Sequence, residues 1–446
     1  MTDLVVLSLE AWDEVWRRNQ HLVAGLLRAD PALRVLFVEP AVDPLHDLVT
    51  RHAPRRGHGV RAVRLSGAEG RLWSFRPNKL LPRKVDPDAD RRLASATVRA
   101  ARRLGFADPL LWINDPSGAE VLRQTGWPAL YDITDDWLEA ERTPAEHARL
   151  VRDEGFLMER CAEVVVCSSS LAETKGRRRR VTLVPNAVDV GFYRRPQPRP
   201  ADLPDGPVAV YVGTVHTDRI DLDLCVATAR ALGDAGALVL VGPHPLSGGD
   251  VERLRAAGVL LLGARPASEV PGYLQHADVL VVPHVVTPFT MSLDPIKRYE
   301  YAAVGRPVVS TPVTGFVDAT DPRVTVASGD AFAASVRAAI PSPTRFPDGA
   351  DAPVPGWSDR VEEMAGALGR VRAAGPAPAG SRPLRLVIDV LSAPAESGGM
   401  RRYADELIHA WLETEEGRRD ELIVHGEPWI LDAFADLERV RTIPVR

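Results

Sequence analysis

Short apolar runs alternate with longer stretches of helical periodicity along most of this chain. Apolar runs rich in Val, Leu and Ile occur at 4–9, 34–40, 110–115, 129–134, 163–169 and 181–189. The segments between them are long enough for helices, and the first of these is expected at about 13–28. Strands that alternate with helices are typical of an α/β fold with a parallel sheet.

A second series of the same kind follows a proline-rich stretch at 194–207, which is interpreted as a linker. Its predicted strands are 208–213, 237–242, 259–263, 278–284 and 307–311. The pattern therefore predicts two Rossmann-like lobes, 1–195 and 196–372, with a crevice between them. Ligands are expected at the carboxyl ends of the strands.

A third segment begins after a second linker, 373–383. Residues 384–446 contain a strand pattern, a Gly-Gly loop and a helix pattern, followed by about two more strands. This segment is interpreted as an incomplete third Rossmann-like unit, or alternatively as a small appendage docked on the second lobe. The sequence leaves both readings open.

Composition excludes several classes of protein. The 446 residues carry 55 basic and 60 acidic side chains, a net charge of -5 that gives no reason to expect a nucleic-acid partner. The three cysteines have no metal-type spacing and form no disulfide framework, which fits a reducing cytoplasm. No signal peptide and no apolar run long enough for a membrane span is recognised, so a cytoplasmic location is expected.

The stretch SLDPIKRYEYAAVGRPVVST (292–311) predicts a helix that runs through a glycine into a strand. Asp294 is expected to cap this helix, and the missing N–H of Pro295 costs nothing in the first turn. Gly305 is expected to end the helix in a left-handed conformation. Lys297 is unusual there, because a cation in the first helical turn opposes the helix dipole.

A bound phosphate would explain Lys297, since a helix N-terminus offers free N–H groups to an anion. Ile296, Tyr299 and Ala303 form the expected core face, which leaves Lys297 and Glu300 on a neighbouring face. Glu300 would accept hydrogen bonds from the vicinal hydroxyls of a ribose. The alternative is a surface ion pair at i, i+3, which stabilises a helix by only a few tenths of a kcal/mol.

Three further residues are predicted to contribute to a nucleotide site in the second lobe. Gly213 ends a predicted strand, where the backbone must approach a ligand closely, and Arg219 follows at a predicted helix start. The turn at Arg265 and Pro266 would contact a base edge through its backbone groups.

These segments resemble the C-terminal lobe of GT-B fold glycosyltransferases of the broad family 4 type. The matching segments are VGT, GARPASEVPGYLQHADVLVVPH and DPIKRYEYAAVGRPVVST, and the resemblance covers roughly residues 1–370. It is strongest to the branch that includes bacterial teichuronic-acid and exopolysaccharide enzymes. The resemblance implies that Glu300 binds the nucleotide ribose and that the segment with Ser292 and Lys297 faces the diphosphate.

The resemblance also implies a nucleoside-diphosphate sugar as donor, most simply a UDP-sugar, with no permanently bound cofactor. Many family 4 enzymes have a second glutamate eight positions before the ribose-binding one, and Ser292 occupies that position here. The sequence therefore leaves open both the sugar contact and whether the transfer retains or inverts the anomeric configuration. Helix ends and basic side chains would neutralise the diphosphate, so no metal is expected.

The first lobe offers carboxylates for acid–base chemistry. LYDITDDWLEA (130–140) ends a predicted strand with Asp135 and Asp136, which would face the crevice and accept a proton from an acceptor hydroxyl. The alternative is that one of them caps the following helix. The resemblance favours these two residues over Asp132.

Other polar and aromatic side chains follow the first strand. Trp12, Trp16 and Arg18 would stack on sugars or bind an anion, or they pack within the lobe. His21 is a candidate base, with a structural role as the alternative. The basic run at 177–180 is interpreted as a solvated loop, or as a peripheral contact with the inner face of the plasma membrane or with a lipid diphosphate acceptor.

Three functions agree with these patterns. The leading hypothesis is a glycosyltransferase of the hexosyltransferase type that modifies a glycan, a lipid-linked or a small-molecule acceptor in cell-surface polysaccharide or glycoconjugate synthesis. A sugar-nucleotide epimerase or hydrolase of the same fold would need no acceptor. A non-catalytic scaffold would have kept the fold alone. No P-loop and no dinucleotide fingerprint follows a predicted strand, so NTP hydrolysis and redox chemistry are not supported.

Overall fold

A computed structural model describes most of the chain. The described residues are 2–44, 56–79, 83, 86, 88–140, 142–340, 353–375, 385–390, 398–413, 421–434, 437 and 440–445. Within these, the chain separates into two compact units, Met1–Pro376 and Ala377–Arg446. Each unit has its own sheet or sheets and is described by itself.

The first sheet of unit Met1–Pro376 has eight strands in the order β3-β4-β2-β1-β5-β6-β7-β8. All neighbouring pairs are parallel except β3 and β4, which are antiparallel. The strands are β1 (Thr2–Leu7), β2 (Leu33–Val38), β3 (His58–Ala62), β4 (Leu72–Arg76), β5 (Leu110–Ile113), β6 (Ala129–Ile133), β7 (Glu163–Val166) and β8 (Thr182–Leu183).

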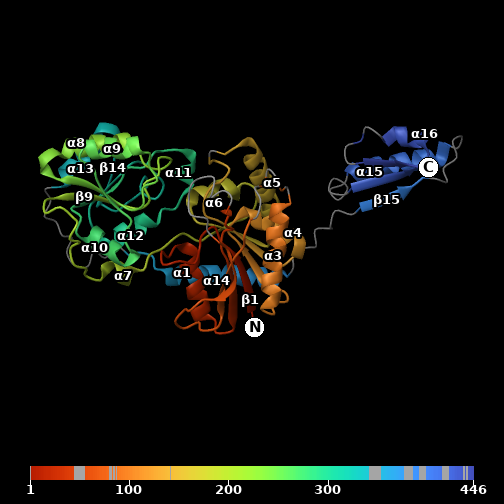
Figure 1. The fold of residues 1–446 in the computed structure, drawn as a ribbon, viewed down its shortest axis with the longest axis horizontal. Coiled ribbons are helices and arrows are strands. Elements are labelled where there is room, and N and C mark those ends of the chain that lie inside the picture. The colour runs from red at the N-terminus through yellow and green to blue at the C-terminus, as the bar shows by residue number, and fades with distance from the viewer. Residues whose placement is uncertain are drawn as a thin grey trace. The chain divides into compact units, whose positions relative to one another are not determined.

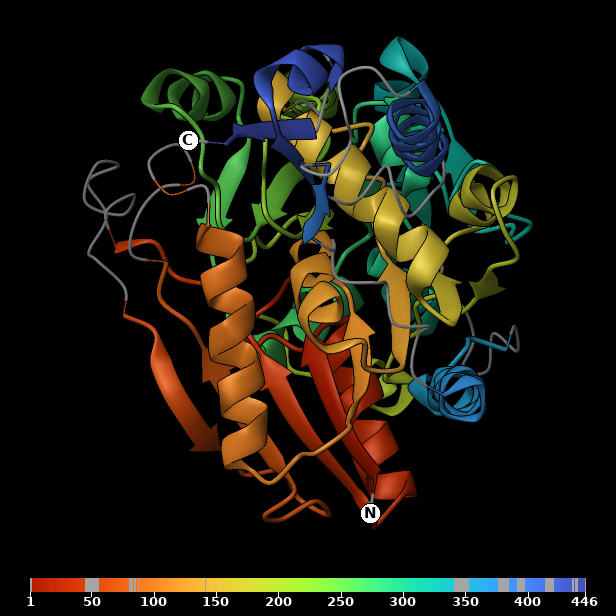
Figure 2. The same cartoon turned by 90° about the vertical axis from the view of Figure 1, so that its right-hand side faces the viewer.

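Helices cover both faces of this sheet (Figures 1 and 2). One face packs against α1 (Arg18–Ala29) and α14 (Trp357–Ala374), whose apolar side chains share a core with the central strands. The other face carries α3 (Ala89–Arg103), α4 (Ala119–Thr125) and α5 (Pro144–Arg160). Burial on both faces explains why the central strands are nearly continuous apolar runs.

The second sheet has six strands, all parallel, in the order β11-β10-β9-β12-β13-β14. These strands are β9 (Val208–Val212), β10 (Ala237–Val241), β11 (Leu260–Gly263), β12 (Val279–Val282), β13 (Val308–Ser310) and β14 (Val324–Val326).

Helices again form two layers around the second sheet (Figure 1). One core joins the sheet to α8 (Leu222–Leu232), α9 (Gly248–Ala256) and α13 (Gly329–Ala339). A second core joins the opposite face to α10 (Val270–Gln275) and α12 (Ile296–Val304). Among the shorter helices, α11 (Pro288–Ser292) contacts α6 (Ser169–Gly176) of the first lobe, and α7 (Val190–Arg194) packs against α10 and α12.

The α14 helix follows the second sheet in sequence but packs on the first. Met364 and Val371 are fully buried in the core that also contains α1. The returning chain forms a parallel bridge between Val188 and Gly356. The predicted boundaries placed α14 in the second lobe, 196–372, and did not anticipate that this helix packs on the first sheet. The predicted domain boundaries stay predictions.

Unit Ala377–Arg446 contains a three-stranded parallel sheet in the order β15-β16-β17. The strands are β15 (Arg385–Asp389), β16 (Glu421–Gly426) and β17 (Val440–Pro444), accompanied by α15 (Gly398–Glu413) and α16 (Pro428–Leu431). The predicted α/β fold of this segment is confirmed. Most of the predicted linker lies outside the described residues.

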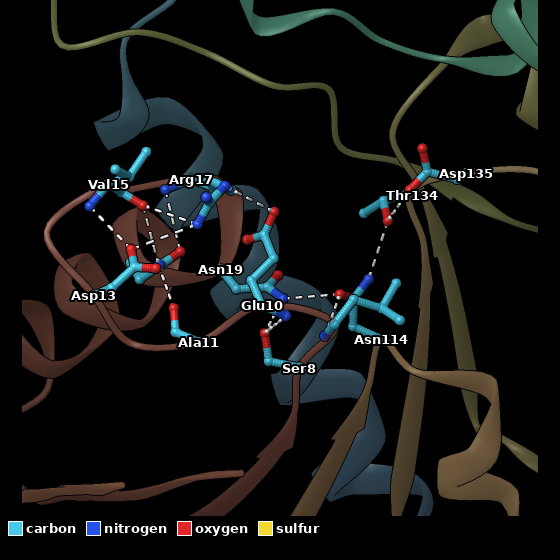
Figure 3. A network of polar contacts seen from close by, with 12 residues as sticks. Ser8, Glu10, Ala11, Asp13, Val15, Arg17, Asn19, Asn114, Thr134 and Asp135 are labelled. Carbon is cyan, nitrogen blue, oxygen red and sulfur yellow. Dashed lines mark hydrogen bonds and ion pairs between the residues drawn. The ribbon is translucent and has the colours of Figure 1, made fainter. Parts of the chain in front are cut away.

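The α/β prediction is confirmed, with differences at the ends of elements. The first helix begins at Arg18 rather than near residue 13, because residues 9–17 form a loop of bends (Figure 3). Strands β3, β4 and β14 were not predicted. No helix in the described part of the chain is long and apolar enough to cross a membrane.

Candidate functional site

The two sheets place their strand ends where a doubly wound fold binds ligands. In the first sheet β1 lies between β2 and β5, and in the second sheet β9 lies between β10 and β12. The strand order reverses at these positions, and crevices form there beyond the carboxyl ends. Gly213 follows β9 and Asp135 follows β6 on the neighbouring lobe, so the predicted residues of both lobes lie at such ends.

Lys297 lies directly over Gly213. A Cβ atom built on Gly213 would be 2.6 Å from the Lys297 Nζ and 3.0 Å from the Tyr211 hydroxyl, and Gly213 has a φ of 148°. The Lys297 Nζ is also 5.0 Å from the centre of the Tyr211 ring. No carboxylate of the described residues lies within ion-pair distance of this ammonium, so its charge is available to an anion.

The start of α12 is consistent with an anion site beside Lys297, but the predicted helix cap is wrong. Asp294 does not cap the helix; the capping position is Pro295, and no side chain bonds to the first N–H groups. The Asp294 carboxylate instead accepts hydrogen bonds from the Asn186 backbone N–H at 2.6 Å and from the Tyr299 hydroxyl at 3.0 Å. The first turn of α12 thus has no side-chain cap among the described residues, which suits a phosphate.

Glu300 lies one turn further along α12. Its Oε1 accepts a hydrogen bond of 2.6 Å from the hydroxyl of Tyr193. Burial raises the pKa of Glu300, and Tyr193 and the Lys297 charge act in the opposite direction. The carboxylate therefore has one oxygen fixed by Tyr193 and lies within the electrostatic field of Lys297.

Arg219 links the two lobes electrostatically. It lies in the loop before α8, with its guanidinium 5.4 Å from the centre of the Phe289 ring. Burial raises the pKa of Asp135, and the charge of Arg219 opposes that rise. Burial together with Lys297 and Arg219 lowers the pKa of His284 to about 3, so His284 is neutral beside these two cations at neutral pH.

The two predicted catalytic aspartates differ in their surroundings. Asp136 is buried in an ion pair of 2.9 Å with Lys175, which also contacts Glu154 at 2.8 Å. The Asp135 carboxylate has no such ion pair among the described residues and accepts a hydrogen bond of 3.1 Å from the Thr134 hydroxyl. Asp135 is thus the more available of the two for proton transfer.

Ser292 contacts the first lobe through both its side chain and its backbone. Its hydroxyl accepts a hydrogen bond of 3.3 Å from the Asp136 N–H, and its carbonyl accepts one of 2.6 Å from the Ser168 hydroxyl. Its side chain is therefore used to join the lobes in this structure. Arg265 lies apart from this group, in an exposed pair with Asp202 that also contacts the Tyr273 hydroxyl at 2.9 Å.

The candidates in the loop and helix after β1 have structural partners. Arg18 is buried and forms a double contact with Asp132, with its Nη2 3.1 Å from the Asp132 Oδ1. The His21 ring stacks on Trp357 at 4.7 Å, and burial lowers its pKa to about 4. Trp16 packs edge-on against His21. These contacts favour the packing alternatives over ligand binding.

Sequence reasoning missed Glu10, the acid that follows β1. One of its carboxylate oxygens, Oε2, is buried without a hydrogen-bond partner among the described residues. Burial raises the pKa of Glu10 to about 7. The only sequence signal was an acidic residue soon after the first strand, at the edge where ligands bind.

The described residues contain no group of three or more His, Cys, Asp or Glu side chains placed to hold a metal ion. The charged groups that converge are instead two cations of the second lobe, Lys297 and Arg219, opposite carboxyl groups of the first lobe. Such an arrangement is suited to a multiply charged anion on one side and to proton transfer on the other.

Comparisons with known proteins show which sequences and folds this chain resembles. Residues 206–341 match the sequence model of the family described as Glycosyl transferases group 1. The chain is 25% identical over 219 residues to TuaH of Bacillus subtilis (strain 168), named for a glycosyltransferase of teichuronic acid biosynthesis. That match covers 45% of this chain and 55% of TuaH, so it spans about half of each protein.

Solved structures show the same fold at low sequence identity. Sucrose-phosphate synthase from Thermosynechococcus elongatus has a TM-score of 0.57 and 17% identity, over 84% of this chain and 100% of that chain. Alr3699/HepE of Anabaena, solved in complex with UDP-glucose, has a TM-score of 0.53 and 15% identity, over 84% and 97%. The chain therefore has the GT-B fold, as predicted.

Proposed function

We propose that this protein is a glycosyltransferase that moves a sugar from a nucleoside-diphosphate sugar to an acceptor hydroxyl. The observation that carries the proposal is the position of Lys297, whose ammonium lies over Gly213 beside the uncapped start of α12. An ammonium, a glycine backbone and free helical N–H groups in one place suit a diphosphate.

The remaining residues of the second lobe extend this site. Glu300 would bind the ribose through the oxygen that Tyr193 leaves free, and Arg219 would add a second positive charge near the diphosphate. A bound uridine nucleotide is the proposed donor, in line with the UDP-glucose held by Alr3699/HepE. Arg265 would contribute through the backbone of its turn, because its side chain is paired with Asp202.

The first lobe would supply the acid–base chemistry. As the acceptor oxygen attacks the anomeric carbon, the bond from that carbon to the diphosphate breaks and the acceptor proton passes to a carboxylate. Asp135 is the proposed proton acceptor, since it is free of the ion pair that holds Asp136. Ser292 and Asp136 would then position α11 and the strand end rather than react.

The acceptor is proposed to belong to cell-surface polysaccharide or related glycoconjugate synthesis, by likeness to TuaH. A peripheral membrane contact through the basic run would fit a lipid-linked acceptor. Arg179 is unavailable for it, because its guanidinium donates to the Met158 and Cys161 carbonyls. The other three arginines of the run would make the contact.

Nucleotide binding to the Lys297→Ala and Glu300→Ala variants tests this proposal. A screen of UDP-, GDP- and dTDP-sugars by thermal shift identifies the donor, because a ligand that binds only the folded state raises Tm. Titration calorimetry with the corresponding nucleoside diphosphate should then show about 10- to 100-fold weaker binding to Lys297→Ala, as expected for the loss of a charged hydrogen bond.

Arg298→Ala is the matched control, because Arg298 is an exposed cation of the same helix. Its affinity should stay within about twofold of the unmodified protein. The proposal is wrong if no sugar nucleotide shifts the melting temperature, or if Lys297→Ala and Arg298→Ala bind equally well. Turnover of the donor with no acceptor present would indicate an epimerase or hydrolase instead.

A further inference from the structure

We propose that Tyr193 is a positioning residue of the nucleotide site: its hydroxyl holds Glu300 for the ribose and keeps it from pairing with Lys297. This inference rests on the proposed function and adds a residue to its second-lobe half. Tyr193 lies in α7, in the stretch of chain that runs from the first sheet to the second. It acts through the Glu300 carboxylate rather than on the reacting atoms.

Lys297 and Glu300 have the spacing of an ion pair, yet they do not form one. Residues three apart on a helix are neighbours on its surface, and opposite charges at that spacing attract each other. In the described part of the chain the two side chains are not within ion-pair distance. Burial raises the pKa of Glu300, and the hydrogen bond from Tyr193 and the charge of Lys297 oppose that rise, so the two charges still interact through space. A further contact must hold the carboxylate apart from the ammonium.

The Tyr193 hydroxyl provides that contact. It donates to the Glu300 Oε1 at 2.6 Å, a short distance that is typical of a hydrogen bond to a carboxylate. Burial raises the pKa of Tyr193, and the charge of Glu300 raises it further, so the hydroxyl keeps its proton and stays a donor. Without this hydrogen bond the carboxylate would be free to turn along the helix toward Lys297.

The ring of Tyr193 is itself fixed by packing. Together with Val190 it lies against a small apolar cluster, and α7 packs on α12 there. The buried members of this cluster are Val188, Tyr299 and Ala303. Gln275, the last residue of α10, donates to the Tyr193 carbonyl at 2.8 Å. The hydroxyl therefore reaches Glu300 from a support that is held on two sides.

The second carboxylate oxygen of Glu300 remains available to a ligand. No donor of the described residues bonds to Oε2, and unlike the unpartnered oxygen of Glu10 it is not closed off from solvent. Glu300 is half-buried, so little water competes with a sugar hydroxyl for this oxygen. A nucleotide without ribose hydroxyls would leave the oxygen unpaired. Tyr193 thus contributes to selectivity for nucleotides that carry ribose hydroxyls.

The same contact keeps the diphosphate site charged. The Lys297 ammonium lies over Gly213, with no carboxylate of the described residues within ion-pair distance. If Glu300 turned to Lys297, each would neutralise the other and both would be withdrawn from the nucleotide. One hydroxyl therefore keeps two binding groups apart, an acceptor for the ribose and a cation for the diphosphate.

The test compares Tyr193→Phe with Tyr301→Phe by titration calorimetry. Each change removes one hydroxyl and keeps the ring. Tyr301 follows Glu300 in α12, but its hydroxyl is directed to the Val281 carbonyl in the core. The probes are the nucleoside diphosphate selected by thermal shift (UDP for the proposed donor), its dideoxy analogue without ribose hydroxyls, and inorganic pyrophosphate. Urea unfolding measures how much stability each hydroxyl contributes.

Ligand selectivity separates a positioning role from a structural one. The unmodified protein should bind the nucleoside diphosphate about 10- to 100-fold more tightly than its dideoxy analogue, as expected for hydrogen bonds to a charged group. Tyr193→Phe should reduce this ratio to about threefold or less and weaken pyrophosphate binding about threefold or more, because Glu300 then pairs with Lys297. Tyr301→Phe should keep both values within about twofold of the unmodified protein, even where it lowers stability.

A double-mutant cycle with Glu300→Gln isolates the contact. A neutral amide has no charge to pair with Lys297. In the Glu300→Gln background, Tyr193→Phe should therefore change pyrophosphate affinity by less than about twofold. Such non-additivity would show that Tyr193 acts through Glu300.

The inference is overturned if Tyr193→Phe matches Tyr301→Phe in either binding measurement, or if the effects of Tyr193→Phe and Glu300→Gln simply add. Failure of the proposed function gives a different result: no nucleoside diphosphate binds the unmodified protein, or Lys297→Ala binds it as well as Arg298→Ala does. The two failures are therefore distinguishable.

Discussion

Gly213 is the residue on which the position of Lys297 depends. Replacing it with alanine would place a methyl group 2.6 Å from the Lys297 ammonium and force a side chain into a φ of 148°. We expect about 10-fold weaker binding of the nucleoside diphosphate, because the ammonium must move, and about 1–2 kcal/mol lower stability from backbone strain. Titration calorimetry measures the affinity for the nucleoside diphosphate, and urea unfolding measures the free energy of unfolding.

Gly206→Ala is the control for this substitution, since an added Cβ meets nothing within 4 Å there. It should leave nucleotide affinity unchanged. If Gly213→Ala binds the nucleoside diphosphate as tightly as the unmodified protein, the Lys297 ammonium finds an equivalent position. The close approach of Lys297 to Gly213 would then not be needed for binding.

His21 makes stability depend on pH. Its folded-state pKa of about 4 lies below the ordinary value of 6.5, so the unfolded chain binds more protons between these values. Stability from this group is therefore fully present above pH 6.5 and is lost as pH falls toward 4. His21→Phe, which keeps the stacking on Trp357, should reduce the difference between unfolding free energies at pH 7 and pH 4.5 by about 1–3 kcal/mol. If the difference between the unfolding free energies at the two pH values is unchanged, the pKa of His21 is not lowered in the folded protein.

Some residues of the candidate site could be predicted from the local sequence, and others could not. Lys297 and Glu300 share a helix, so their proximity follows from spacing alone. Asp294 was wrongly expected to cap that helix, because its partners, Asn186 and Tyr299, are set by tertiary structure. The burial of Glu10 depends on how its loop folds over the sheet, which local sequence does not specify.

At the level of helices and strands, α14 contacts α1, although the two helices lie far apart in the sequence. It packs against α1 so closely that a Cβ on Gly25 would lie 2.2 Å from a methyl group of Val361. Alanine normally stabilises a helix interior relative to glycine by about 0.5–1 kcal/mol. We expect Gly25→Ala to have the opposite sign, with about 1–3 kcal/mol lower stability from overpacking.

Gly155→Ala in α5 is the matched comparison, because nothing lies within 4 Å of a Cβ at that position. Urea unfolding should show a gain of about 0.5–1 kcal/mol there. If both substitutions stabilise the protein, the close approach of α1 and α14 is not present in solution.

Elements with strong apolar runs were predicted well, and weak ones were missed. β1, β2, β9 and β12 are nearly all apolar and buried, which makes them visible in sequence. β3 reads HGVRA and is half exposed at a sheet edge, and β14 has only three residues. Edge strands need little apolar surface, so their pattern is faint.

For the whole molecule, the compact unit Met1–Pro376 contains every residue of the proposed site. The small sheet of unit Ala377–Arg446 has its own apolar core. A chain that ends at Pro376 should therefore fold, bind the nucleoside diphosphate within about twofold of the full chain, and keep its melting temperature for the larger unit within about 2 °C, since no core side chain is removed.

Calorimetric unfolding and nucleotide titration of the shortened protein check this expectation. Loss of nucleotide binding on truncation would show that residues beyond Pro376 complete the site. Aggregation of the shortened chain would show that the smaller unit covers apolar surface of the larger one.

The bridge between Val188 and Gly356 places the outgoing and returning chain side by side where they pass between the lobes. Two paired strands of chain resist twisting and sideways sliding more than one would, yet they still bend. We therefore expect the lobes to bend relative to each other near this bridge rather than to slide past each other. A donor bound by the second lobe would then approach the proposed acids of the first lobe by that bending alone, so the double crossing of the backbone would help to align the reactants.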